Sequence, residues 1–130
     1  MATLSMTERT NDGGVTTGVD THADTHVAAA FDDLGRRLGH LTIATTPAGY
    51  ARLLAWAQGF GTVRAFGVEG TGSYGAGLTD FLTEAGCVVL EVNRPNRQAR
   101  RARGKSDPLD AEAAARAVLA GDAKGPCQEP

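Results

Sequence analysis

A change of hydrophobic period near Thr46 constrains the fold of this chain more than any other feature. Before it, three apolar or β-branched runs follow one another with short turns between them, at residues 15–19, 26–31 and 36–45. This spacing predicts three antiparallel strands, because only antiparallel neighbours can be joined by such short turns. After Thr46, apolar residues recur at the spacing of a helix face.

The second part of the chain is predicted to alternate helices with strands. Thr46-Pro47 places a capping residue before a proline, which is typical of a helix start, and Gly59 and Gly61 mark the end of that helix. The following segments predict a strand, a helix, a strand and a last helix, in that order: residues 63–68, 78–85, 87–92 and 108–120. The order β-β-β-α-β-α-β-α predicts an α/β domain with a mixed five-stranded sheet and flanking helices.

The length of 130 residues suits one domain. We expect three segments: a disordered leader at residues 1–13, the folded domain at 14–122 and a divergent tail at 123–130. The leader has no apolar signal-peptide core, and no apolar run is long enough to span a membrane. We therefore expect a cytoplasmic protein with no membrane partner. Cys87 and Cys127 show no metal-ligand spacing.

The net charge of −2 conceals a local basic segment, in which no acid lies between Val92 and Ser106. It holds six of the thirteen basic residues: Arg94, Arg97, Arg100, Arg101, Arg103 and Lys105. Arginine pairs with phosphate through two parallel hydrogen bonds, so the segment is a candidate for contact with DNA or RNA. The alternative is a solvated charged surface. No aromatic residue lies among these arginines, so the pattern does not indicate base stacking.

Four carboxylates occupy positions that suggest a metal site. Asp20 ends the first predicted strand and Glu69 ends the fourth, so neighbouring strands would bring both to one end of the sheet. Asp107 and Asp110 are three residues apart at the start of the last helix and share a face. Oxygen ligands favour Mg²⁺ or Mn²⁺, and two such ions can activate an attacking oxygen and stabilise a leaving one in phosphodiester chemistry.

Each of these acids also has a purely structural interpretation. Asp107-Pro108-Leu109-Asp110 is a good helix start, with a capping Asp, a proline in the first turn and an acid favoured by the helix dipole. Asp20 and Glu69 could be turn residues at strand ends. Further polar residues alternate with Asp20 and would share its face in a single strand, as metal ligands or as a structural cluster: His22, Asp24 and His26.

The segment Gly70-Thr71-Gly72-Ser73-Tyr74-Gly75 matches the G-x-G-x-x-G pattern of dinucleotide-binding folds. Glu91 lies near the position of a ribose-binding acid. Two points oppose this alternative: Glu69 would place a negative charge near a pyrophosphate, and the loop follows three strands instead of opening the fold. The glycines could instead let the backbone pass close to a metal or a phosphate. Ser73 could touch a phosphate with Tyr74, or cap the next helix.

Four segments together resemble the amino-terminal domain of the insertion sequence 110 family of transposases: Gly18-Val19-Asp20-Thr21-His22, Val68-Glu69-Gly70-Thr71-Gly72-Ser73-Tyr74-Gly75, Asn93-Arg94-Pro95-Asn96-Arg97 and Gly104-Lys105-Ser106-Asp107-Pro108-Leu109-Asp110-Ala111. The resemblance covers about residues 15–122. It implies an RNase H-like fold similar to the RuvC Holliday-junction resolvases. The family's DEDD tetrad falls on Asp20, Glu69, Asp107 and Asp110, with Mg²⁺ or Mn²⁺ as cofactor. DNA and a guide RNA from the element are the implied partners.

The resemblance also implies a limit on activity. Full-length members of the family continue into a second domain with a catalytic serine, which no serine of this chain matches. Residues 125–130 do not resemble that continuation, so we expect a truncated transposase for metal-dependent DNA transposition or site-specific recombination, not competent alone. The alternative is an inactive nucleic-acid-binding remnant. We also expect the last helix to leave an apolar face uncovered at Ala114, Val118 and Leu119, favouring a homo-oligomer.

Overall fold

The computed structural model describes residues 13–92 and 107–121 of the chain. Its elements follow the predicted order: β1 (Gly14–Thr21), β2 (Thr25–Asp32), β3 (Arg37–Ala44), α2 (Pro47–Gln58), β4 (Thr62–Val68), α3 (Ala76–Glu84), β5 (Val89–Glu91) and α5 (Asp107–Leu119). The predicted basic segment and tail, and all but the last residue of the leader, lie outside the described residues, so the limits set for the domain stay predictions. No helix in the described part is long and apolar enough to cross a membrane.

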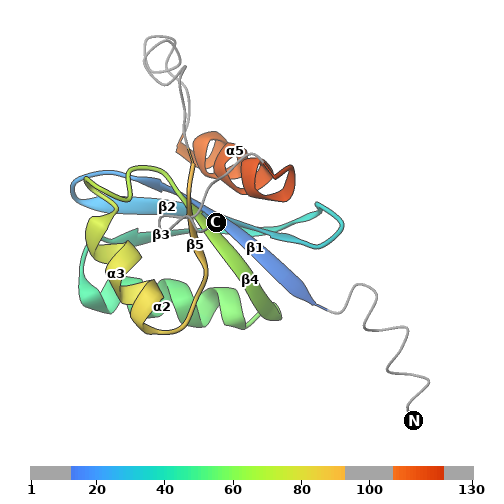
Figure 1. Cartoon of the computed structure of the whole chain (residues 1–130), viewed down its shortest axis with the longest axis horizontal. Helices are drawn as coiled ribbons and strands as arrows, with labels where there is room; N and C mark the ends of the chain where they lie inside the picture. The colour runs from blue at the N-terminus through green and yellow to red at the C-terminus, as the bar shows by residue number, and fades with distance from the viewer. Residues whose placement is uncertain (1–12, 93–106, 122–130) are drawn as a thin grey trace, which may run out of the picture.

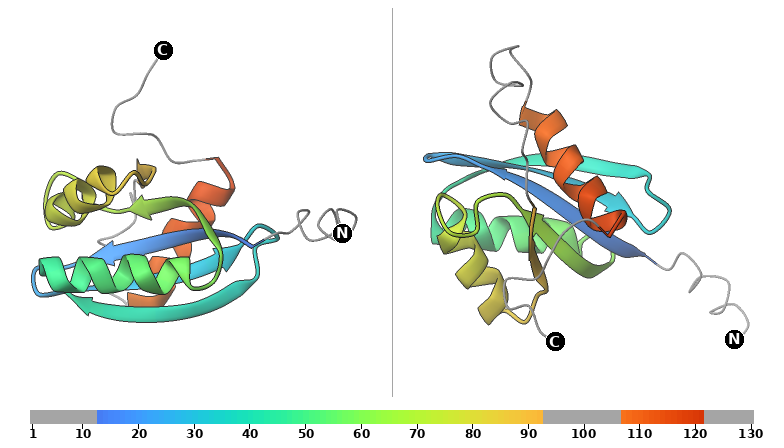
Figure 2. Two further views of the ribbon diagram at one scale, coloured as in Figure 1. Left: turned by 90° about the horizontal axis from the view of Figure 1, so that it is seen from below. Right: turned by 45° about the horizontal axis from the view of Figure 1, so that its top comes forward.

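The strands form one mixed five-stranded sheet in the order β3-β2-β1-β4-β5, as predicted. The pairs β1–β2 and β2–β3 are antiparallel, whereas β1–β4 and β4–β5 are parallel. The helices α2 and α3 cover one face of this sheet and α5 covers the other (Figures 1 and 2). The parallel pairing of β1 and β4 means that both strands end at the same edge, which we call the carboxyl edge.

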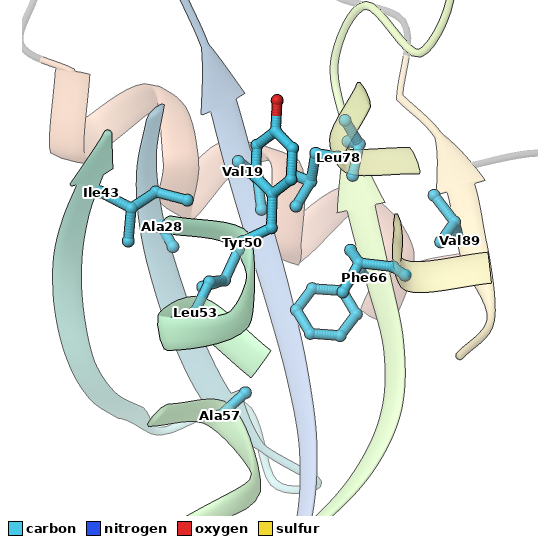
Figure 3. Close-up of a cluster of buried hydrophobic side chains, with 11 residues drawn as sticks. Val19, Ala28, Ile43, Tyr50, Leu53, Ala57, Phe66, Leu78 and Val89 are labelled. Carbon is cyan, nitrogen blue, oxygen red and sulfur yellow. The ribbon is translucent and has the colours of Figure 1, made fainter. Parts of the chain in front are cut away.

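The main core lies between the sheet and the two helices α2 and α3 (Figure 3). On the sheet side, alternate residues such as Val19 and Phe66 face this core, because side chains of a strand alternate between its two faces. Leu53 and Ala57 of α2 meet them at the i, i+4 spacing of one helix face. Full burial of a side chain such as Phe66 or Leu53 contributes about 1.5–3 kcal/mol to folding.

The predicted start of α2 is confirmed. The Thr46 hydroxyl accepts a hydrogen bond from the Gly49 amide at 3.0 Å, and Pro47 is the first helical residue. The predicted strand at residues 87–92 is shorter, because β5 covers only Val89–Glu91. Cys87, which was predicted to begin the strand, belongs to the end of α3 instead, because its amide donates a hydrogen bond to the Leu82 carbonyl.

His22, Asp24 and His26 do not lie in one strand, so they do not share a face with Asp20. His22 and Asp24 lie in the turn between β1 and β2, where the His22 amide donates to the Thr25 carbonyl at 3.1 Å. His26 belongs to β2 and stacks on Tyr50 of α2, with ring centroids 6.0 Å apart. The alternation fails because antiparallel pairing requires the chain to reverse direction between the two strands.

The apolar face of α5 is not uncovered as expected. Ala111 and Ala115 form a second core cluster with Val27, Ala29 and Phe31 of β2, and Ala114 is fully buried. Val118 packs on Gly67 of β4, and only Leu119 is clearly exposed, at 38%. The small side chains of α5 are therefore explained by close packing on the sheet, and they give no support to self-association through this helix.

We predict that protonation of His26 destabilises the fold. Burial lowers the pKa of the His26 imidazole below its ordinary value of 6.5, and the bond to the Thr25 carbonyl only partly opposes this. Within the described residues, the buried Nε2 atom has no hydrogen-bond partner, so protonation there would create a buried donor without an acceptor. Because the folded state favours neutral His26, this stability is present above about pH 6.5 and is lost as the pH falls towards the lower pKa of the folded state.

Urea unfolding between pH 5 and pH 7.5 checks this prediction. Wild type should lose stability over the acid half of that range, and His26→Phe, which keeps an aromatic ring against Tyr50, should lose less. His40→Gln is the comparison variant: it removes the histidine that pairs with Glu112 from another strand, and it should keep at least the acid loss of wild type, because His26 is unchanged. An equal pH dependence of wild type and His26→Phe would show that another group controls acid stability.

Candidate functional site

Asp20 and Glu69 lie side by side at the carboxyl edge of the sheet. The parallel register pairs Val19 with Val68, one residue before each acid. The Glu69 amide donates to the Val19 carbonyl at 3.3 Å, and the Thr21 hydroxyl donates to the Glu69 carbonyl at 2.8 Å. The two acids are only 1% and 5% exposed. The sequence-based expectation that these strands are neighbours is therefore correct.

Both acids belong to the face of the sheet that α5 covers. Gly18 lies two residues before Asp20 on β1, and Gly67 of β4 lies two residues before Glu69, which directly follows that strand and whose amide continues its pairing with β1; a Cβ atom on either glycine would meet atoms of α5. Residues two apart on a strand share a face. The polypeptide thus directs Asp20 and Glu69 to the side of the sheet where the last helix lies.

The helix α5 brings a third acid, Asp110, to this edge. Its amino-terminal end lies towards the end of β1 (Figure 2). Asp110 precedes Ala114 by one helical turn, and the Ala114 carbonyl lies against Gly67. At 3% exposure, Asp110 is buried in this position. Asp107 begins α5 one residue earlier than predicted, and its side chain lies outside the described residues.

A polar contact ties α5 to the edge strand β3. Glu112 Oε2 lies 2.9 Å from Arg37 Nη1 and 2.7 Å from His40 Nε2. These side chains are partly exposed, so the ion pairs contribute modestly to stability. Their main effect is on the position of α5. Together with the packing of Ala111 and Ala115, they hold in place the helix that carries Asp110.

His22 touches the most buried of the three acids. Its Nε2 atom lies 3.0 Å from Asp20 Oδ2, and its side chain is about one-third exposed (34%). The turn after β1 folds His22 back towards the strand it follows. The polar cluster considered at this strand end therefore exists for Asp20 and His22, whereas His26 lies on the face covered by α2.

The glycine loop that follows Glu69 is attached to β5. Gly70 has a φ angle of +74°, which favours glycine, and its carbonyl accepts hydrogen bonds from Ser73 and Gly75. Ser73 does not cap α3, because Gly75 occupies the cap position and no side-chain bond is made there. Glu91 accepts hydrogen bonds from the amide and the hydroxyl of Thr71. Sequence reasoning considered Glu91 only as a ribose-binding acid and missed this contact.

The chemistry of the three buried acids fits a hard divalent cation, because carboxylate oxygens are the ligands that Mg²⁺ and Mn²⁺ prefer. In the described part of the chain, no group of three His, Cys, Asp or Glu side chains is arranged to hold an ion by itself. As they lie, Asp20, Glu69 and Asp110 therefore do not form a ready-made site, and an ion would need these side chains to change position or further oxygen ligands to join them. Asp107 and the six predicted basic residues lie outside the part where side chains are described.

Comparisons with known proteins identify a family and a fold for this chain. Residues 17–127 match the sequence model of a family described as a transposase, the DEDD transposases of insertion sequence 110. T. thermophilus RuvC in complex with Holliday junction substrate is similar in structure, with a TM-score of 0.60 and 19% identity over 85% of this chain and 98% of that one. A second Thermus thermophilus RuvC structure has a TM-score of 0.54 and 17% identity over 85% and 99%. No curated protein sequence matches the chain. The RNase H-like fold implied by the resemblance is confirmed.

Proposed function

This chain belongs to the insertion sequence 110 family of DEDD transposases, and from that premise we propose that it acts on DNA through a divalent-metal site at the carboxyl edge of its sheet. The observation that carries the proposal is the burial of Asp20, Glu69 and Asp110 at one edge. Burying several carboxylates together is unfavourable unless a cation or hydrogen bonds compensate their charge. All three acids lie within the residues that match the family.

We propose that Asp20, Glu69 and Asp110, together with Asp107, hold Mg²⁺ or Mn²⁺. A bound ion would polarise a phosphodiester and favour the ionised form of an attacking hydroxyl or water. The role of the protein is to hold the carboxylates and to limit access of bulk water. His22 contributes by engaging one oxygen of Asp20, Oδ2, which leaves Oδ1 for a ligand.

DNA is the proposed substrate. One of the similar RuvC structures holds a Holliday junction, and the match to a transposase family makes DNA strand exchange the reaction class we propose. The basic segment from Arg94 to Lys105 ends two residues before Asp107, so we assign its six basic side chains to nucleic-acid phosphates, of DNA or of a guide RNA. By the family resemblance, the serine that would hold a broken strand covalently lies in a second domain.

The dinucleotide-binding alternative loses support. The acid that would bind a ribose, Glu91, is engaged by Thr71 of the glycine loop itself. The sheet is mixed, with β1, β2 and β3 antiparallel, whereas dinucleotide-binding folds use a mostly parallel sheet. The alternative of an inactive remnant would bind nucleic acid without catalysis, and loss of metal binding is the cheapest property by which to recognise it.

Metal titration therefore tests the proposed function. Mn²⁺ added to the purified chain should give saturable binding by calorimetry, and Asp20→Asn and Glu69→Gln should each raise the dissociation constant at least tenfold, since each removes a charged ligand. Without metal, both variants should be as stable as wild type or more so, because mutual repulsion is reduced.

Asp24→Asn and Glu84→Gln are the matched controls, because each removes the same charge at an exposed position. They should bind Mn²⁺ as wild type does. Equal affinity in Asp20→Asn and wild type would refute the metal site. Absence of metal binding by a wild-type chain that still binds DNA would support the remnant instead.

A further inference from the structure

Two anchors fix the backbone around Glu69 from opposite sides. On the β1 side, the Glu69 amide bonds to the Val19 carbonyl at 3.3 Å, and the Thr21 hydroxyl bonds to the Glu69 carbonyl at 2.8 Å. On the β5 side, Glu91 Oε1 accepts a hydrogen bond from the Thr71 amide at 3.1 Å and another from the Thr71 hydroxyl. The first anchor holds Glu69 itself, and the second holds the residue two positions later.

The sheet places Glu91 where it can reach the loop. The parallel register pairs Glu91 with Val68, and the Val92 amide donates to the Val68 carbonyl at 3.1 Å. The strands β4 and β5 therefore end together, and the Glu91 side chain extends to Thr71, three residues beyond Val68. An ionised acceptor makes a hydrogen bond about twice as strong as a neutral one, and this contact is partly buried.

Two backbone hydrogen bonds close the glycine loop on itself, and its last residue is bonded to α3, where the Gly75 carbonyl accepts from the Thr79 amide and hydroxyl. The Gly70 carbonyl accepts from the Ser73 amide at 3.0 Å and from the Gly75 amide at 2.8 Å. These bonds give the loop its shape but do not attach it to the strand β5. The contact between Glu91 and Thr71 does attach it, and it therefore sets how the chain leaves β4 immediately after Glu69.

We propose that Glu91 is a positioning residue: by holding Thr71, it fixes the loop of residues 70–75 and so the orientation of the Glu69 carboxylate towards the metal. The inference rests on the proposed function, because it assigns Glu69 to the metal site. Release of Thr71 would let the backbone rotate about Gly70, which has no side chain to resist it. Groups that orient a metal ligand without touching the ion change metal affinity about 10–100-fold when they are removed.

Four variants and two controls test this inference by Mn²⁺ calorimetry. Glu91→Ala and Thr71→Val should each raise the dissociation constant about tenfold, and the double variant should be no weaker than either single one, because both remove the same contact. Glu91→Gln keeps an acceptor oxygen and should bind within about threefold of wild type. Glu84→Ala and Thr83→Val are matched controls at exposed positions of α3, and should bind as wild type.

Hydrogen exchange of the backbone amides provides a readout that needs no metal. Exchange of residues 70–75 should be faster in Glu91→Ala and Thr71→Val than in wild type, while the exchange of β1 is unchanged. Faster exchange of the loop, together with weaker Mn²⁺ binding in the same two variants, supports the positioning role. Unchanged exchange of the loop in Glu91→Ala overturns it whatever the metal does.

The remaining outcomes separate this inference from the proposed function. If wild type binds Mn²⁺ and Glu91→Ala binds equally well, the positioning role is overturned and the metal site stands. If Glu91→Gln is as weak as Glu91→Ala while Thr71→Val binds normally, Glu91 acts through its charge or as a ligand, and the positioning role is again overturned. If wild type does not bind Mn²⁺ at all, the proposed function fails and this inference fails with it.

Discussion

Replacing Gly18 by alanine is expected to destabilise the folded chain by about 3 kcal/mol or more, the upper range for overpacking a core. A Cβ atom at this position would lie 2.2 Å from both the Ala111 carbonyl oxygen and the Ala115 amide nitrogen of α5. Both contacts are with helix backbone, which cannot turn aside as a side chain can. The substitution must therefore push α5 away from β1, or prevent it from docking.

A graded series of glycine substitutions measures this effect by urea unfolding. Gly72→Ala is the control, since no atom lies within 4 Å of its added Cβ. Gly67→Ala should have an intermediate effect, because its nearest contact is the Val118 side chain at 2.4 Å, which can change rotamer, and the Ala114 carbonyl follows at 3.0 Å. Equal stability of Gly18→Ala and Gly72→Ala would mean that α5 does not pack on β1 in solution.

The same substitution should also affect the proposed metal site. The absence of a side chain at Gly18 allows α5 to pack closely on β1, and α5 carries Asp110. Displacement of α5 would therefore move one carboxylate away from the carboxyl edge. Folded Gly18→Ala is therefore expected to bind Mn²⁺ more weakly than wild type, although Asp20 and Glu69 are unchanged. This links the closeness of the helix–sheet packing to the chemistry at the sheet edge.

Changing Arg97, Arg100 and Arg101 together to alanine is expected to weaken DNA binding strongly and to reduce its dependence on salt. Each phosphate contact releases condensed counterions, which contributes about 0.9 to the slope of log affinity against log salt concentration for duplex DNA. Loss of three contacts should therefore flatten the slope by up to about three units. The measurement is DNA affinity by fluorescence anisotropy over a range of salt concentrations.

A control with the same charge change separates a specific contact from an effect of net charge. Changing Arg36, Arg52 and Arg64 to alanine removes three exposed positive charges outside the basic segment. This control should keep most of the wild-type slope. If it flattens the slope as much as the first variant does, the basic segment has no special role, and nucleic acid responds to the charge of the whole chain.

The order of elements and the class of sheet could be predicted from the sequence. Short turns between residues 15 and 45 predicted antiparallel strands, and the later change of period predicted helices alternating with strands. The spacing of apolar residues reflects which positions are buried. It therefore predicts a helix or a strand wherever the pattern of burial is enough to distinguish the two. The positions of Asp20 and Glu69 at strand ends followed from the same pattern, and so did the start of α2 at Thr46-Pro47.

The contacts that shape the site were decided by the tertiary structure. The period of a strand or helix shows that a residue is buried but not which distant residue buries it. Ala114 was therefore expected to be exposed, although it packs on Gly67, and Glu91 was assigned to a ligand, although it binds Thr71 of its own chain. His22 reaches Asp20 because the chain turns back, which a pattern of alternate residues cannot express. Alternation along the sequence encodes the two faces of a strand, whereas the choice of neighbour depends on how strands and helices far apart in the sequence come together.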